Sequence, residues 1–281
     1  MMSRFALLLC LLLPLAACKP DAAPAVVETS VTPVAEPVAQ QASAEDPAAQ
    51  AAAEAAAQAA AAAAAQSPPP VAGTDYIELP SGQPFETTDG RIEVVEFFGY
   101  VCPYCAAVQP TVRAMKAKLP PDVNVVYVPA AFGSIWDTYA KAFYSAQAMG
   151  LVEKSHDAMY RAIHIDKTLK GERGEDSPEQ IAAFYANYGA DPKQFVSSMQ
   201  SFAVAAKVSR GKQYMTLAFS NGDGPSTPTF LVNGKYRIKG KTPEDVFRIL
   251  NQVIVAERAK RTGAPATDAP VAATAAEPAQ S

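Results

Sequence analysis

Aromatic residues are confined almost entirely to one stretch of this 281-residue chain, and they limit where a hydrophobic core can form. Residues 74–260 contain the single Trp, all 11 Tyr and all but one of the 12 Phe. The flanks, 19–73 and 262–281, consist mainly of Ala, Pro, Val, Gln and acidic residues, which bury too little apolar surface to fold. A stretch of 187 residues, counted from 74 to 260, can build one core without disulfides. We therefore expect one globular domain over 74–260.

Charge is balanced within this domain. Residues 74–260 hold 21 basic and 20 acidic residues, so the net charge of −4 comes largely from the flanks. No basic stripe typical of nucleic-acid binding is present, and we expect no nucleic-acid partner. With only four cysteines, the chain is not a disulfide-rich secreted module.

Residues 1–17 are typical of an export signal. Arg4 supplies a positive charge, Phe5–Leu13 is apolar, and small residues follow. The apolar run is too short to span a bilayer, which needs about 20 residues. We therefore expect export across the bacterial inner membrane and removal of the signal.

Residues 15–18 (Leu-Ala-Ala-Cys) resemble the bacterial lipobox, in which the cysteine is lipidated and becomes the first residue of the mature chain. Because an unpaired cysteine is unusual in an exported protein, we expect Cys18 to be lipidated. The alternative is ordinary signal cleavage that leaves Cys18 as a free thiol. Lys19 resembles the residue found at this position in lipoproteins sorted to the outer membrane, which favours that membrane. After cleavage and lipidation, only Cys102 and Cys105 remain as thiols.

Residues 18–73 form an Ala- and Pro-rich tether. Within it, 48–65 contains 15 Ala, and Ala has the highest helix propensity, so this piece is predicted to be helical. Because alanine offers little surface for packing, we interpret the helix as a semi-rigid spacer; a partner-binding helix is the alternative. Ser67–Pro70 would end it. Residues 261–281 are expected to be a disordered tail.

The first half of the domain has the pattern of a βαβ unit. Ile92–Phe98 is rich in β-branched and aromatic residues and is predicted to be a buried strand. A helix follows from the Cys-Pro-Tyr-Cys motif to about Lys118, and Val123–Val128 is a second strand. The crossover should be right-handed.

The second half adds helices and then a hairpin. Residues of about 134–219 show helical spacing and capping signals, including a capping box at Ser177–Gln180. Thr229–Val232 and 235–239 are predicted strands joined by Asn233-Gly234, a strong hairpin signal, and Thr242 begins a last helix. This order indicates an α/β fold, namely a thioredoxin-like core with an inserted helical subdomain.

The Cys102-Pro103-Tyr104-Cys105 motif is predicted to be a redox centre. A three-residue offset places both sulfurs on one side of the first helical turn. Cys102 precedes that turn, where free N–H groups and the helix dipole favour an anion, so its pKa should fall and it should act as the nucleophile. Cys105 should be buried and act as the resolving thiol, and Pro103 suits the first helical position.

Half of a zinc site is the usual alternative for such a motif. Zinc would need two further ligands, and the chain offers only His156 and His164, which are eight residues apart in the helical region. We expect no metal and interpret both histidines as surface or capping residues, the alternative being a role near the substrate groove.

Two separated segments resemble the DsbA family of thiol:disulfide interchange proteins. They are 95–105 (VEFFGYVCPYC) and 227–236 (TPTFLVNGKY), and the resemblance covers about 74–258. It implies that Pro228 is a cis-proline facing Cys102 and that Thr227 offers backbone groups to an extended substrate. Tyr104 and Pro103 would contact substrate as well.

Glu96 matches the family's buried acid beneath the redox centre. Flanked by apolar residues, this acid is either a proton relay or a strand-edge charge, and the resemblance favours the relay. Three features depart from the family: Tyr104 stands where oxidising members usually have His, Thr227 replaces the commoner Val, and 123–128 contains no lysine to partner Glu96. They leave the fold intact and predict a weaker oxidant.

We therefore expect a monomeric, lipid-anchored, periplasmic enzyme that introduces disulfides into unfolded exported proteins with free cysteines. The chain has no cofactor-binding motif, so another protein should reoxidise it; the resemblance suggests a DsbB-like membrane quinone reductase. A reductase or isomerase of the same fold is the main alternative, although 18–73 is no folded dimerisation domain of the kind isomerases have. A tethered peptide-binding chaperone is the alternative from another class.

Overall fold

The computed structural model describes residues 55, 58–59, 62, 64–86 and 90–263. The export signal, the lipobox with Cys18 and Lys19, and the tail beyond Gly263 lie outside these residues. Among the described residues, no helix is both long and apolar enough to cross a membrane.

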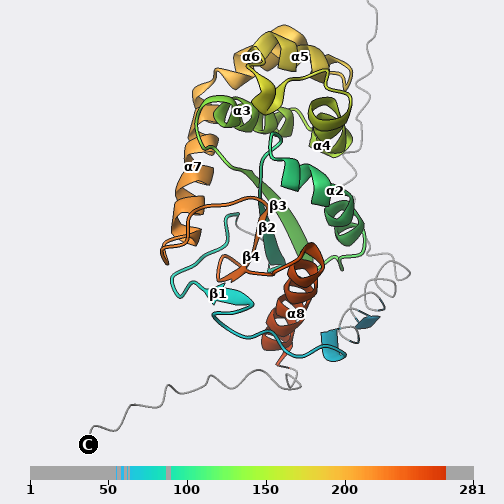
Figure 1. Cartoon of the computed structure of the whole chain (residues 1–281), viewed down its shortest axis with the longest axis vertical. Helices are drawn as coiled ribbons and strands as arrows, with labels where there is room; N and C mark the ends of the chain where they lie inside the picture. Colours follow the sequence, from blue (N-terminus) through green and yellow to red (C-terminus); the bar gives the residue numbers. More distant parts are fainter. Residues whose placement is uncertain (1–54, 56–57, 60–61, 63, 87–89, 264–281) are drawn as a thin grey trace, which may run out of the picture. The chain divides into compact units, whose positions relative to one another are not determined.

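A five-stranded mixed sheet forms the centre of the domain (Figure 1). Its spatial order is β1-β5-β4-β2-β3, with β2 and β3 parallel and the other neighbours antiparallel. The strands are β1 Tyr76–Glu78, β2 Ile92–Phe98, β3 Val123–Pro129, β4 Thr229–Val232 and β5 Tyr236–Ile238. β2 is buried along its whole length because β4 and β3 flank it and helices cover both faces.

Helices cover the two faces of the sheet unequally. α2 (Pro103–Lys116) and α8 (Pro243–Thr262) pack on one face, where Val94, Val112 and Leu250 belong to one apolar cluster. α7 (Phe202–Ala218) packs on the other face through a second cluster. The first turn of α2 lies at the end of β2 that points towards the inserted helices (Figure 1).

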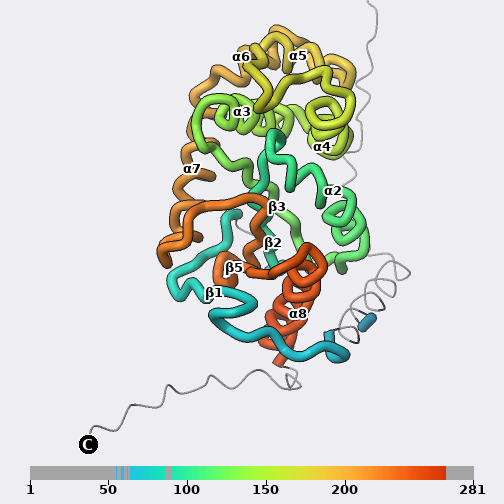
Figure 2. The backbone as a smooth tube through the Cα atoms, viewed as in Figure 1, coloured from blue at the N-terminus to red at the C-terminus, as the bar shows by residue number. Residues whose placement is uncertain are grey.

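The inserted subdomain is a set of helices between β3 and β4. The backbone leaves the sheet after β3, passes through α3 to α6 and returns along α7 (Figure 2). Its elements are α3 Ser134–Ala148, α4 Val152–Tyr160, a π-helical turn Arg161–Ile165, a 3₁₀ turn Gly171–Arg173, α5 Pro178–Ala186, α6 Pro192–Met199 and α7. The predicted capping box is present, since Gln180 N–H donates to the Ser177 hydroxyl and Ser177 N–H donates to the Gln180 side chain.

Two details differ from the prediction. The sheet has a fifth strand, β1, which was not predicted because it is only three residues long and pairs at the edge with β5. The helix after the redox motif ends at Lys116 rather than near Lys118. The hairpin is as predicted: Asn233 and Gly234 have φ angles of 51° and 67°, which a tight turn of this type requires.

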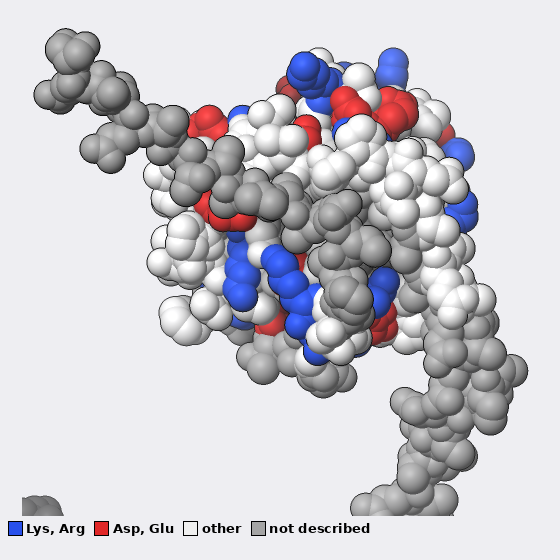
Figure 3. All heavy atoms as spheres, turned by 90° about the horizontal axis from the view of Figure 1, so that it is seen from below, with Lys and Arg blue, Asp and Glu red and all other residues white. Residues whose placement is uncertain are grey.

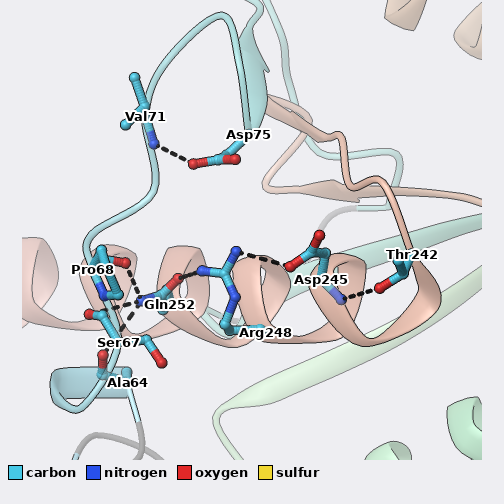
Figure 4. Close-up of polar contacts among 9 residues, drawn as sticks. All are labelled: Ala64, Ser67, Pro68, Val71, Asp75, Thr242, Asp245, Arg248 and Gln252. Atoms are coloured by element: carbon cyan, nitrogen blue, oxygen red, sulfur yellow. Dashed lines mark hydrogen bonds and ion pairs between the residues drawn. The ribbon is translucent and has the colours of Figure 1, made fainter.

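The end of the tether contacts the domain. The described residues between 55 and 65 are helical, as predicted for the Ala-rich stretch. The Gln252 side chain on α8 donates to the carbonyl oxygens of Ala64, Ser67 and Pro68 at 3.3, 3.4 and 2.8 Å (Figure 4). Because the last carbonyls of a helix lack internal partners, Gln252 caps this helix from outside.

Lys and Arg side chains gather in the middle of the face seen from below Figure 1 (Figure 3). Basic residues in the C-terminal turns of α8 have partners within the domain. Arg258 pairs with Asp122 at 2.7 Å, and Lys260 pairs with Glu257 at 2.9 Å. Arg261 donates to the backbone carbonyl oxygens of 90 and 91. Arg258 thus ties the end of α8 to the turn before β3, and Arg261 ties it to the segment before β2.

Candidate active site

Cys102 is the N-cap residue of α2. Its backbone is extended (φ −76°, ψ 118°), and its sulfur accepts a hydrogen bond from the N–H of Cys105 at 3.4 Å. Both cysteines are free thiols and are buried. Pro103 follows at the first helical position, and the Tyr104 side chain is 75% exposed. The local geometry therefore agrees with the sequence prediction for this motif.

A second segment closes over the Cys102 sulfur. The Thr227–Pro228 peptide bond is cis and directly precedes β4. The Cys102 Sγ lies 3.7 Å from the Thr227 carbonyl oxygen, to which the protonated thiol donates. The Thr229 hydroxyl donates to the Ser226 carbonyl at 2.9 Å and holds the turn. The fold thus brings together the two motifs that are about 125 residues apart in sequence.

The two thiols have opposite pKa shifts. Hydrogen bonding from the Cys105 thiol is the largest cause that lowers the pKa of Cys102, to about 6, and the Thr227 side chain and the N–H groups of Cys105 and Tyr104 contribute. Burial raises the pKa of Cys105 far above its ordinary value, and its hydrogen bond to Cys102 acts in the same direction. At neutral pH, Cys102 is therefore the thiolate and Cys105 the thiol.

Glu96 lies within β2, opposite Tyr127 of β3 and Phe230 of β4. Its side chain is 1% exposed, and among the described residues neither carboxylate oxygen has a hydrogen-bond partner. Burial raises the pKa of Glu96 to about 8. Since β2 is an internal strand, the strand-edge interpretation of this acid is wrong, and Glu96 is a buried acid whose charge raises the pKa of Cys105.

Sequence reasoning missed the residues that hold the turn before Cys102. Gly99 faces Trp136 so closely that a Cβ atom on it would lie 2.2 Å from the indole ring. The Trp136 Nε1–H donates to Glu172 at 2.9 Å, which fixes the ring. A glycine directly after a buried strand was the one available signal, because it marks close approach of another group.

The interpretation of the histidines as surface or capping residues is wrong. His156 is only 5% exposed and lies among aromatic rings, and His164 is half-buried. Both contact Tyr100, in the turn that leads to Cys102. Among the described residues, no group of three or more His, Cys, Asp or Glu could hold a metal ion.

Comparison with known proteins identifies the family. Residues 87–252 match the thioredoxin family. The thiol:disulfide interchange protein DsbA of Pseudomonas aeruginosa is 37% identical over 192 residues, which is 67% of this chain and 86% of that protein. The DsbA of Azotobacter vinelandii is 36% identical over 190 residues, 66% of this chain and 84% of that protein. The crystal structure of DsbA from Xylella fastidiosa is 38% identical, with a TM-score of 0.64 over 68% of this chain and 98% of that one.

The chain belongs to the DsbA family of thiol:disulfide interchange proteins. Its thioredoxin-like fold with a helical insert is confirmed, as is its activity as a protein disulfide oxidoreductase. The match begins beyond the tether. Family membership therefore applies to the domain, whereas the tether and the lipid anchor rest on the sequence of residues 1–73 alone.

Proposed function

We propose that this chain oxidises pairs of thiols in exported proteins, with Cys102 as the nucleophile and Cys105 as the resolving thiol. The observation that carries the proposal is the position of Cys102, at the N-terminus of α2 and under the cis-proline segment, with a pKa lowered to about 6. A sulfur with these properties is a stable leaving group as well as a reactive centre.

The reaction uses the oxidised form of the pair. A substrate thiolate attacks the Cys102 sulfur, the Cys102–Cys105 bond breaks, and its electron pair goes to Cys105, which takes a proton. A second substrate thiolate then attacks the substrate sulfur of the mixed disulfide and releases the Cys102 thiolate. The substrate has lost two electrons and two protons. The enzyme pair has gained both electrons and one proton, on Cys105, and the other proton goes to solvent.

Neighbouring residues support these steps. The Thr227 backbone groups beside Cys102 are placed to pair with an extended substrate strand. Pro228 fixes that segment, and the exposed Tyr104 and Pro103 form the adjoining surface. Glu96, protonated near neutral pH, serves as the proton donor for the Cys105 thiolate as it leaves, because it is the acid whose charge is felt by Cys105.

The enzyme works without a cofactor of its own, in the periplasm, as a monomer. A DsbB-like membrane quinone reductase reoxidises the pair. Lipid on Cys18 anchors the chain, and Lys19 favours the outer membrane. The basis for the anchor is the Leu-Ala-Ala-Cys pattern at 15–18. Cys18→Ser should move the protein from the membrane fraction to the soluble fraction, and unchanged fractionation would refute the anchor.

Trapping of mixed disulfides tests the chemistry. Cys105→Ala lacks the resolving thiol, so it should accumulate mixed disulfides with exported proteins on non-reducing gels. Cys102→Ala should accumulate none. The reverse pattern would assign the nucleophile to Cys105. A double substitution that still assists the refolding of reduced ribonuclease in a glutathione redox buffer, which supplies the oxidant, would favour the chaperone alternative.

A further inference from the structure

The two histidines of this chain converge on one residue, Tyr100, which lies two positions before Cys102. The Tyr100 hydroxyl lies 2.9 Å from His156 Nδ1. The Tyr100 carbonyl oxygen lies 2.7 Å from His164 Nε2. Because a carbonyl oxygen only accepts, His164 carries its proton on Nε2. The inserted subdomain therefore holds both the side chain and the backbone of Tyr100.

Tyr100 is part of the turn that positions the nucleophile. The Cys102 N–H donates to the Gly99 carbonyl at 3.0 Å, which closes a four-residue turn with Tyr100 and Val101 at its centre. The two common forms of such a turn differ by a flip of the central peptide, whose oxygen is the Tyr100 carbonyl. The hydrogen bond from His164 to that oxygen fixes the central peptide in one orientation.

A π-helical turn explains how both histidines reach the same residue. Eight residues along a regular α-helix leave two side chains about 80° apart. Here the turn Arg161–Ile165 is π-helical, and the Asp166 N–H donates to the Arg161 carbonyl five residues back at 2.8 Å. Each residue of a π-helix turns by less than the roughly 100° of a regular α-helix, so this segment rotates His164 towards the side of His156. Such wide turns recur at functional sites.

His156 has no other role among the described residues. Aromatic rings enclose it, with centroid distances of 4.5–6.3 Å to Phe98, Tyr100, Tyr127, Phe143 and Tyr160. Its Nε2 has no hydrogen-bond partner there. A leucine would fill such a site without an unpaired Nε2, but it would remove the partner of the buried Tyr100 hydroxyl. The bond to Tyr100 is thus the one polar contact that accounts for a histidine here.

We propose that His156 and His164 are positioning residues for the redox centre, which act through Tyr100 to hold the turn that places the Cys102 sulfur at the N-terminus of α2. Through this turn, the inserted subdomain determines how strongly the N-terminus of α2 stabilises the Cys102 thiolate of the reduced form. This inference rests on the proposed role of Cys102 as nucleophile.

The test compares variants that remove a hydrogen bond with variants that keep it. Tyr100→Phe and His164→Ala each remove one bond; His164→Gln keeps a donor near the position of Nε2. We would measure the equilibrium with glutathione and the pH titration of thiolate absorbance at 240 nm. A net hydrogen bond corresponds to about a three- to tenfold change in an equilibrium constant. Tyr100→Phe and His164→Ala should make the centre less oxidising by about that factor and raise the Cys102 pKa, and His164→Gln should restore most of both values.

Arg161→Ala is the matched control. It lies in the same π-helical turn and pairs with Asp166 on the surface, whereas the hydrogen bonds to Tyr100 described above come from His156 and His164. It should leave the potential and the titration at their wild-type values even if it lowers the melting temperature.

Two outcomes would overturn the inference. One is a wild-type potential and titration in both Tyr100→Phe and His164→Ala; the other is an equal shift in the Arg161→Ala control. Should His164→Ala not fold, Tyr100→Phe and His164→Gln still decide the matter. Equilibration with glutathione needs no protein substrate, so a failure of the proposed function would appear separately, as wild-type protein that equilibrates with glutathione but does not oxidise reduced ribonuclease.

Discussion

Glu93 and Glu96 lie on opposite faces of β2 and differ in how their buried carboxylates are satisfied. Glu93 accepts hydrogen bonds from the backbone N–H groups of Phe85 and Glu86 at 2.6 and 2.8 Å. Glu96 has no partner for either oxygen among the described residues. A buried acid without partners is destabilised when charged. Burial raises the pKa of both acids, but only at Glu93 do backbone N–H groups offset part of that effect.

Glu96→Gln should stabilise the protein at alkaline pH. The folded-state pKa of about 8 lies above the ordinary value of 4.5, so the contribution of Glu96 to wild-type stability is greatest below about pH 4.5 and is lost as the pH rises through 8. Glutamine does not ionise, so the variant does not lose this stability. The free energy of unfolding of the variant, relative to wild type, should therefore increase between pH 4.5 and 8, by roughly 5 kcal/mol at most, since each pKa unit corresponds to about 1.4 kcal/mol.

Urea unfolding at pH 4.5 and 8.5 checks this expectation, with Glu93→Gln as the control. In that control an amide would face two backbone N–H groups, so it should lose about 1–3 kcal/mol. Equal pH dependence of wild type and Glu96→Gln would show that Glu96 is already charged in the folded state.

Thiolate absorbance of the reduced protein should titrate near pH 6, the pKa of Cys102. Because this folded-state pKa is lowered, the Cys102 thiolate stabilises the reduced form above the ordinary cysteine pKa of 9.0, and the effect is lost as the pH falls through 6. The oxidised form has no such group. The free energy of unfolding of the reduced protein, minus that of the oxidised protein, should therefore increase as the pH rises from 6 to 9.

Tyr104→His should make the centre more oxidising. The 75% exposed tyrosine offers at most a phenolic hydrogen bond to the thiolate, whereas histidine offers a positive charge or a polarised N–H. Each unit by which the Cys102 pKa falls corresponds to about 30 mV in the potential of this two-electron couple. Tyr104→Phe, which keeps the ring, should stay near wild type. A Tyr104→His potential that is unchanged or lower would mean that residue 104 does not tune the centre.

Gly99→Ala should displace Trp136, because the added methyl group would lie 2.2 Å from the indole ring. We expect a loss of about 1–3 kcal/mol, as for other overpacked sites, and a change in the fluorescence of the single tryptophan. Trp136→Phe in the same chain shortens the ring and should recover much of the stability. If the double variant is as unstable as Gly99→Ala, the loss of stability comes from the backbone conformation at residue 99 and not from the contact with Trp136.

Gln252→Glu should release the end of the tether. The carboxylate would face the three carbonyl oxygens that the amide now satisfies (Figure 4). Limited proteolysis near Ser67 should become several-fold faster, while the melting temperature changes little. Gln200→Glu makes the same change at an exposed helix end of the insert and should have no effect. Equal cleavage of all three proteins would mean that the tether is not held by α8.

The sequence was sufficient for the elements with strong local signals. The strand Ile92–Phe98, the hairpin at Asn233-Gly234 and the capped helix starts were predictable because a few adjacent residues determine each of them. The redox pair was predictable for the same reason, since its chemistry follows from its position at a helix start.

What sequence reasoning missed depends on long-range contacts. The edge strand β1 exists because β5 offers it a partner. The positions of His156 and His164 depend on a π-helical turn that residue periodicity does not reveal. Glu96 could be recognised as unusual, but its lack of a partner becomes visible only once β3 and β4 are placed beside it.

The redox loop packs into the inserted helices as well as against Phe98 at the end of β2. Tyr100, Cys102 and Cys105 belong to the same apolar cluster as Phe143 and Met159 of the insert. A boundary drawn around the thioredoxin-like core would therefore cut through a cooperative folding unit. Excising 134–218 would strip the catalytic loop of its packing, and we expect calorimetry of the intact domain to record one melting transition shared by sheet and insert.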